Sequence, residues 1–150
     1  MKKRRLLWAV PPLVLILVMV CFVLAPDRES RTVKQFETDR ERLAQLAERV
    51  LDQGSAEGII PPAPWQSAAL YNSGVAAVEF SMGSFGLGSE TSYWGVNYVP
   101  SDSHMVGFQG QQWDYWKEHK SGRLYYDPEG DNTCYAKKLD ACWYYYEMEF

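Results

Sequence analysis

The sequence predicts an α+β protein: an N-terminal transmembrane helix, an amphipathic helix, and an antiparallel sheet of about five to six strands. Three observations lead to this prediction. Residues 6–25 carry no charge, apolar residues recur at helical spacing within residues 26–54, and the apolar period changes to two within residues 75–150. A helix followed by strands, with no helical pattern between the strands, is typical of the α+β class.

Residues 6–25 form the predicted membrane span. Twenty residues in a helix rise about 30 Å, which matches the thickness of a hydrocarbon core. Pro11 and Pro12 interrupt the run near its start and leave residues 13–24 as the unbroken apolar block. That shorter block would also suit a cleaved signal peptide, which is the alternative.

The end of the run favours retention over cleavage. Ala25 is the small residue suited to a cleavage site, but Pro26 would then follow the scissile bond. Lipoprotein processing at Cys21 is disfavoured because Val20 precedes it, so Cys21 is expected to be a buried apolar residue. We therefore expect an uncleaved signal-anchor.

Charge predicts the orientation of this anchor in the cell membrane. Four cations lie within residues 1–5, and such a cluster resists translocation, so this basic tip is expected to be cytoplasmic. Residues 26–150 then form one extracytoplasmic domain on a single-pass protein. The inverted topology is the alternative, because Arg28, Arg31 and Lys34 follow the span, although acidic residues lie among them.

Composition excludes some partners. The chain has a net charge of −4, and outside the basic tip 11 Lys and Arg stand against 19 Asp and Glu. An acidic surface repels phosphate, so neither nucleic-acid binding nor electrostatic docking on anionic lipid is expected. The glycine-rich stretch at residues 83–90 lacks the GxGxxG order and a lysine, so no nucleotide is expected.

Residues 26–54 are predicted to form an amphipathic helix that ends at Gly54, with Ser30 or Thr32 as the N-terminal cap. Its apolar stripe comprises Val33, Phe36, Leu43, Leu46, Ala47 and Val50. Packing of this stripe on the sheet is favoured over a coiled coil, because only two heptads are present. Residues 55–74, rich in Gly and Pro, are predicted to be a linker that Ile59, Ile60 and Trp65 attach to the core.

The C-terminal stretch CWYYYEMEF (residues 142–150) is predicted to be the final strand. Its even positions lack acids and are expected to face inward, whereas Trp143 and Tyr145 share the other face with two glutamates. We therefore expect Trp143 and Tyr145 on a partly solvated surface. Cys134 and Cys142 would form a disulfide if the hairpin turn centred on Lys138, and would not if it centred between residues 140 and 141.

The sequence offers no strong catalytic or metal motif. His104 and His119 have no metal-ligand spacing, and Ser, Asp and His within residues 101–105 are the composition of a loop. A weak calcium pattern, Asp127, Glu129 and Asp131, departs from the EF-hand because Lys138 occupies its twelfth position. No cofactor is expected.

The order of a membrane helix, a second helix and an antiparallel sheet resembles that of type IV pilins and pseudopilins. The resemblance covers the order of elements only. Those families carry a Gly-Phe processing site before the apolar run and a glutamate five residues into it, whereas residues 6–12 here read LLWAVPP. No site residues follow from the resemblance.

The expected function is a non-catalytic binding or interaction module of the cell envelope, with an envelope protein or glycan as partner. The candidate binding residues are surface aromatics, which can stack on sugars or fill partner pockets: Trp94, Trp113, Trp116, Trp143 and Tyr145. One alternative is a subunit of a membrane complex or pilin-like assembly that uses the apolar helix as its interface. Another is an envelope hydrolase using Glu79, Glu90 or Asp114.

Overall fold

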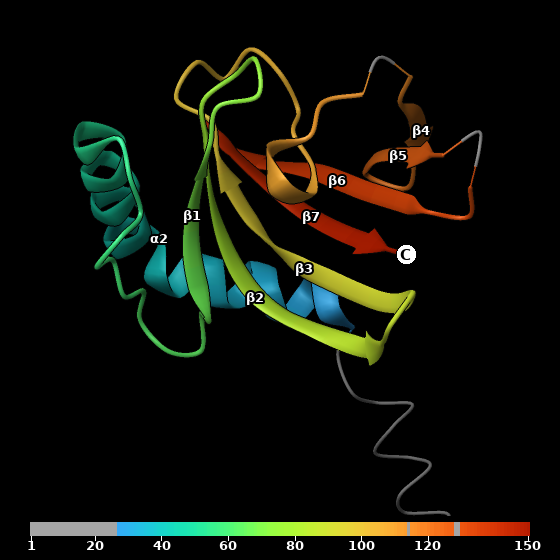
Figure 1. Ribbon diagram of the computed structural model, residues 1–150, viewed down its shortest axis with the longest axis horizontal. Coiled ribbons are helices and arrows are strands. Elements are labelled where there is room, and N and C mark those ends of the chain that lie inside the picture. Colours follow the sequence, from blue (N-terminus) through green and yellow to red (C-terminus); the bar gives the residue numbers. More distant parts are fainter. Residues whose placement is uncertain (1–26, 114, 128–129) are drawn as a thin grey trace, which may run out of the picture.

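A long helix, α2 (Arg28–Gln53), packs against one seven-stranded antiparallel sheet in the computed structural model, which describes residues 27–113, 115–127 and 130–150 (Figure 1). The strands are β1 (Ser67–Tyr71), β2 (Ala77–Leu87), β3 (Glu90–Tyr98), β4 (Lys117–His119), β5 (Gly122–Tyr126), β6 (Thr133–Asp140) and β7 (Trp143–Glu149). They are ordered β1-β2-β3-β7-β6-β5-β4, so the last strand of the chain lies in the centre. The α+β class with an antiparallel sheet is confirmed, with seven strands instead of five or six.

The ends of α2 are capped. Gly54 adopts a left-handed conformation (φ 65°) and closes the helix as predicted. The N-terminal cap is Asp27, whose carboxylate accepts the Ser30 N–H at 2.7 Å. The prediction of Ser30 or Thr32 as the cap was wrong, since both lie inside the helix.

The apolar stripe of α2 is buried against the sheet as predicted, except for Val33, which is half-buried. Phe36, Leu43, Ala47 and Val50 are at most 3% exposed and share one cluster with strand residues. Within residues 27–150, as far as the structure describes them, no helix is long and apolar enough to span a bilayer. The predicted anchor, residues 6–25, and Cys21 lie outside the described residues.

The predicted linker, residues 55–74, contains an edge strand that the sequence pattern did not reveal. Strand β1 has the sequence SAALY, whose small residues give a weak alternation, and it pairs with β2. Trp65 is buried and Ile59 packs against the same cluster, as expected. Ile60 is 83% exposed, so the prediction that it attaches the linker to the core was wrong.

The two faces of the sheet are covered differently. On the helix-covered face, Val78, Phe80, Val96 and Trp143 pack under α2. On the loop-covered face, the connection between β3 and β4 lies over the sheet and includes the short 3₁₀ helix η1 (Phe108–Gly110). Figure 1 shows α2 and η1 on opposite sides of the sheet.

Both faces of β7 are therefore buried, and one prediction needs correction. Trp143 is 3% exposed and Tyr145 is fully buried, because α2 covers the face that was expected to be solvated. The ring of Trp143 lies 5.0 Å from that of Phe36 on α2. Of the two acids on this face, Glu147 forms an ion pair with Arg28 at 2.9 Å, and Glu149 is exposed at the end of β7.

The register of the last hairpin separates the two cysteines. Cys134 lies opposite Met148, and Asp140 lies opposite Trp143, so Ala141 and Cys142 form the turn. Cys134 is buried, Cys142 is half-buried, and both thiols are free in the structure. The turn therefore lies near residues 140 and 141, the position for which the sequence predicted no disulfide.

Candidate functional site

The loop-covered face carries a groove of about 440 Å³ between three aromatic rings, which we call the aromatic groove. Its rings are Tyr93 of β3, Phe108 of η1, and Phe150, which follows β7. Tyr93 and Phe108 stack at 4.7 Å, and Phe150 meets each of them edge-on at 5.9 Å. The backbone N–H of Phe150 donates to the carbonyl of Thr91, which holds the last ring beside β3.

Polar groups form the rim of the aromatic groove. They come from the β2–β3 turn and the start of β3, from η1, and from the β5–β6 connection: Gly88, Ser89, Thr91, Gln109, Asp131 and Asn132. Asp131 is the one charged side chain among these lining residues. An apolar floor with a few hydroxyl, amide and carboxylate groups around it is the usual composition of a small-molecule site, and the volume lies in the usual range.

Side chains from two strands and from the β1–β2 connection hold η1 over the sheet. Asn97 donates to the carbonyls of Val106 (3.3 Å) and Gly107 (2.9 Å). Ser73, which follows β1, donates to the carbonyl of Gly110 at 3.1 Å. The groove wall therefore depends on polar tethers that fix the position of a loop.

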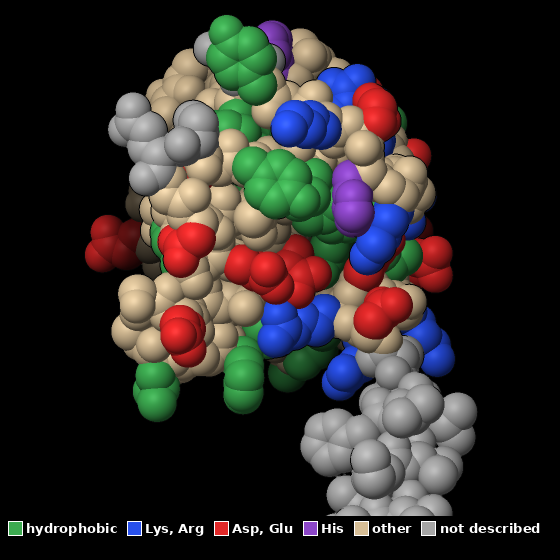
Figure 2. All heavy atoms as spheres, turned by 90° about the vertical axis from the view of Figure 1, so that its right-hand side faces the viewer, with side chains coloured by type: hydrophobic (Ala, Val, Ile, Leu, Met, Phe, Trp, Pro, Cys, Tyr) green, Lys and Arg blue, Asp and Glu red, His purple; other side chains and the backbone are tan. Residues whose placement is uncertain are grey.

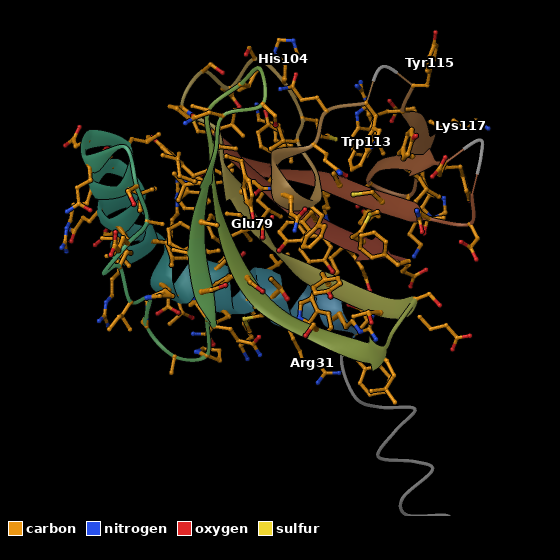
Figure 3. All side chains as sticks on the ribbon, in the orientation of Figure 1. Arg31, Glu79, His104, Trp113, Tyr115 and Lys117 are labelled. Atoms are coloured by element: carbon orange, nitrogen blue, oxygen red, sulfur yellow. The ribbon has the colours of Figure 1, made fainter. Side chains whose placement is uncertain are left out.

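The third tether is the carboxylate of Glu79, which accepts the backbone N–H of Gln109 at 2.7 Å. Gln109 has a φ of 55°, in the left-handed region that non-glycine residues rarely adopt, so this hydrogen bond helps to hold an unfavourable backbone conformation. Glu79 lies on β2, and Figure 3 shows it close to η1. Glu79 thus supports the groove from behind.

Burial gives Glu79 unusual acid–base properties. It is 5% exposed, and this burial raises its pKa from 4.5 to about 7, against the opposing effects of the Gln109 N–H and the Tyr146 hydroxyl. The same burial and the nearby carboxyl hold the pKa of Tyr146 well above its usual value. A carboxyl that titrates near neutrality therefore lies beneath the loop that forms one wall of the aromatic groove.

The predicted surface aromatics do not form one site. Trp113 and Trp116 meet at 5.1 Å, and Trp113 stacks on Tyr125 at 4.7 Å, which makes a half-buried aromatic cluster at the β4–β5 edge. Trp94 lies elsewhere, under the guanidinium of Arg28 at 4.7 Å. Trp143 and Tyr145 are buried beneath α2. The five residues are thus divided among three places.

The candidate hydrolytic carboxylates are also dispersed. Glu79 is buried, whereas Glu90 is exposed at the start of β3. Asp114 lies outside the described residues. The structure therefore brings no pair of these candidates together among the residues it describes.

The candidate calcium pattern is only partly covered. Asp127 accepts a long hydrogen bond from Asn132 at 3.5 Å, Asp131 lines the aromatic groove, and Glu129 lies outside the described residues. No group of three or more potential metal ligands converges among the described residues.

Among Ser, Asp and His within residues 101–105, Asp102 has a structural role. His104 contacts the Ser103 hydroxyl at 2.8 Å on the surface. Asp102 points elsewhere and accepts hydrogen bonds from Lys138 and Tyr144, each at 2.7 Å, and from the Cys142 backbone. These donors lower the pKa of Asp102 to about 2. Residues 101–105 lie in the connection between β3 and η1, as expected of a loop.

Sequence reasoning missed the aromatic groove. Tyr93, Phe108 and Phe150 are far apart in the chain, and they meet because β3 pairs with β7 while η1 folds back over both. The one available signal was the assignment of Phe150 to the inward face of the final strand.

Comparisons with protein-family models, with curated proteins and with solved structures found no match.

Proposed function

We propose that the chain is a single-pass, membrane-anchored extracytoplasmic binding module of the cell envelope, and that its aromatic groove binds a neutral, hydroxyl-rich ligand such as a sugar of an envelope glycan. The observation that carries the proposal is the combination of three rings with a polar rim in one concave site. The anchor and the orientation are supported by the sequence of residues 1–25.

The chemistry of the groove favours this ligand class. The apolar C–H face of a sugar ring can pack on Phe108 or Phe150, while its hydroxyls need the hydrogen-bonding groups of the rim. No lysine or arginine is among the lining residues, so a phosphate or carboxylate would lack a charge partner there. A neutral ligand fits the groove better than an anionic one.

The aromatic groove suits a ligand better than the aromatic cluster does. The rings of Trp113, Trp116 and Tyr125 pack on one another in stacked and edge-on contacts, as the groove rings do, and all three are half-buried. Phe150, by contrast, is 39% exposed at the mouth of a concave site. Glu79 is set back behind Gln109, which fits a supporting role better than proton transfer to a ligand.

The test is a binding measurement on the full chain in phosphatidylcholine nanodiscs. Neutral hexose oligomers and N-acetylglucosamine oligomers would be titrated and followed by saturation-transfer NMR. Phe150→Ala is expected to weaken binding about tenfold, which corresponds to about 1.4 kcal/mol, within the range of one aromatic contact. Tyr126→Ala, which removes a ring that is 53% exposed outside the groove, should leave the affinity unchanged. Failure of every sugar to bind, or equal losses in the two variants, would reject the proposal.

A further inference from the structure

The tip of the β2–β3 hairpin exposes two large apolar side chains. Phe85 is 71% exposed and Leu87 is 91% exposed, immediately before the turn at Gly88 and Ser89. The two residues are two positions apart on one strand, so their side chains point to the same side. Phe85 also borders a groove of about 470 Å³ that Met82 and Trp94 help to line. The exposed side chains thus adjoin a groove that combines apolar residues with Arg28 and Arg31.

This tip lies beside the first turn of α2. The guanidinium of Arg28 is 6.0 Å from the Phe85 ring and 4.7 Å from the Trp94 ring. The same side chain pairs with Glu147 at 2.9 Å, which fixes the start of α2 against the sheet. Figure 2 shows hydrophobic side chains projecting at this end of the molecule, next to Lys and Arg side chains.

The position of Arg28 in the chain connects this surface to the bilayer. Two residues separate Ala25, the last residue of the apolar run, from Arg28, and the three Cα–Cα steps between them reach at most about 11 Å. The polar layer on each side of a bilayer is about 5–8 Å thick. If residues 6–25 span the membrane, the Arg28 backbone therefore lies within about 11 Å of the hydrocarbon core, and the Phe85 ring lies beside the Arg28 guanidinium.

We propose that the tip of the β2–β3 hairpin, through Phe85 and Leu87, inserts into the interfacial layer of the bilayer in which the chain is anchored. The inference rests on the anchor in the proposed function. Insertion is driven by the apolar side chains, since the acidic domain gains no general attraction to anionic lipid. Two contacts with the membrane, the anchor and the hairpin tip, would fix the orientation of the domain. Gly88, Ser89 and Thr91 border the aromatic groove, so its mouth would then open near the lipid headgroups.

Photo-crosslinking of the full chain tests this. The photoreactive residue p-benzoyl-phenylalanine would replace Phe85, Leu87 or Tyr115 in protein reconstituted into phosphatidylcholine vesicles, and adducts would be identified by mass spectrometry. Tyr115 is the matched control, because it is 84% exposed and lies at the end of the molecule away from Arg31 (Figure 3). All three positions are exposed, so the replacements should leave the fold intact.

Lipid adducts at positions 85 and 87, and none above background at position 115, are expected. Equal lipid labelling at the three positions, or adducts with a second protein chain in place of lipid at 85 and 87, would overturn the inference. Extraction with alkaline carbonate tests separately whether the chain is anchored in the bilayer. Protein that resists extraction without lipid adducts at the tip would reject hairpin insertion alone, whereas released protein would reject the anchor and the insertion together.

Discussion

The helix-covered face and the loop-covered face of the sheet both bury aromatic rings, but they differ in the groups that accompany the rings. Beneath α2, Trp143 meets the rings of Phe36, Phe80 and Tyr98 within a continuous apolar cluster. Beneath η1, the carboxyl of Glu79 and the amide of Asn97 are buried among the rings. The helix α2 is held on the sheet mainly by apolar packing, whereas the loop that contains η1 depends on individual hydrogen bonds.

This difference indicates which face of the sheet is better suited to a ligand-binding site. A packed apolar face supplies stability in proportion to its buried area and gains nothing from a polar ligand. A loop held by a few polar tethers can shift its position when one tether changes, and such regions open at lower free energy than a packed core. The aromatic groove lies on the loop-covered face, which agrees with this division.

The largest expected effect is on the helix-covered face. Trp143→Ala removes the ring that joins α2 to the centre of the sheet, and it should lower the free energy of unfolding by about 3–5 kcal/mol because a large cavity remains. Urea unfolding of the full chain in mild detergent, followed by circular dichroism, measures the loss. Trp116→Ala, at the half-buried sheet edge, is the control and should cost clearly less. Similar losses in both variants would remove the distinction between core and edge.

The next largest effect is on the loop-covered face, where a substitution should raise the free energy of unfolding instead of lowering it. Glu79 binds its proton more readily in the folded chain than in the unfolded one, so stability should fall as pH rises from 4.5 to about 7. Above pH 7 the buried charge lowers the free energy of unfolding by its full amount, about 3 kcal/mol for a pKa shift of this size. Glu79→Gln removes the charge and should therefore stabilise the protein by up to this amount at pH 8, and by little at pH 4.

Unfolding free energies at several pH values between 4 and 8 test this prediction. Glu90→Gln is the matched control, since that carboxylate is exposed, and its pH profile should follow that of the unmodified chain. A Glu79→Gln variant whose stability stays below that of the parent at pH 8 would show that the charged form of Glu79 is favoured under η1.

The contrast between the two faces also explains how much of the structure could be predicted from the sequence. The helix-covered face follows from local periodicity: the apolar stripe of α2 was identified by its spacing, and the change to a period of two within residues 75–150 indicated the strands that it covers. The misplacement of Trp143 and Tyr145 came from assuming that two glutamates mark a solvated face. Glu147 lies on that face but pairs with Arg28, a partner that sequence spacing does not reveal.

The loop-covered face could not be derived in the same way. Its residues come from a connection without a repeating pattern, and Gln109 reaches Glu79 across thirty positions of sequence. The aromatic groove needs the pairing of β3 with β7 and the return of η1, and neither follows from local propensity. Glu79 was considered as a catalytic candidate from its residue type alone, while its burial became apparent only in the fold.

A smaller effect is expected from the amide that tethers the loop. Asn97→Leu keeps a similar volume but leaves the carbonyls of Val106 and Gly107 without their donor, which should cost about 1–3 kcal/mol. Hydrogen exchange should show faster exchange of the Gly107 and Gln109 amides, with little change in α2. Uniformly faster exchange in the helix as well would contradict the idea that the loop is held separately from the packed face.

The smallest effect concerns thiol reactivity and should leave stability unchanged. Cys134 is fully buried on the loop-covered face, and burial raises the pKa of its thiol to about 12, so little of the reactive thiolate forms. Cys142 is half-buried in the β6–β7 turn. Under native conditions iodoacetamide should therefore alkylate Cys142 well before Cys134, as measured by mass spectrometry of the peptides. Loss of both thiols to a bond between them, or equal rates at the two sites, would mean that the cover over Cys134 opens or that the hairpin register differs in solution.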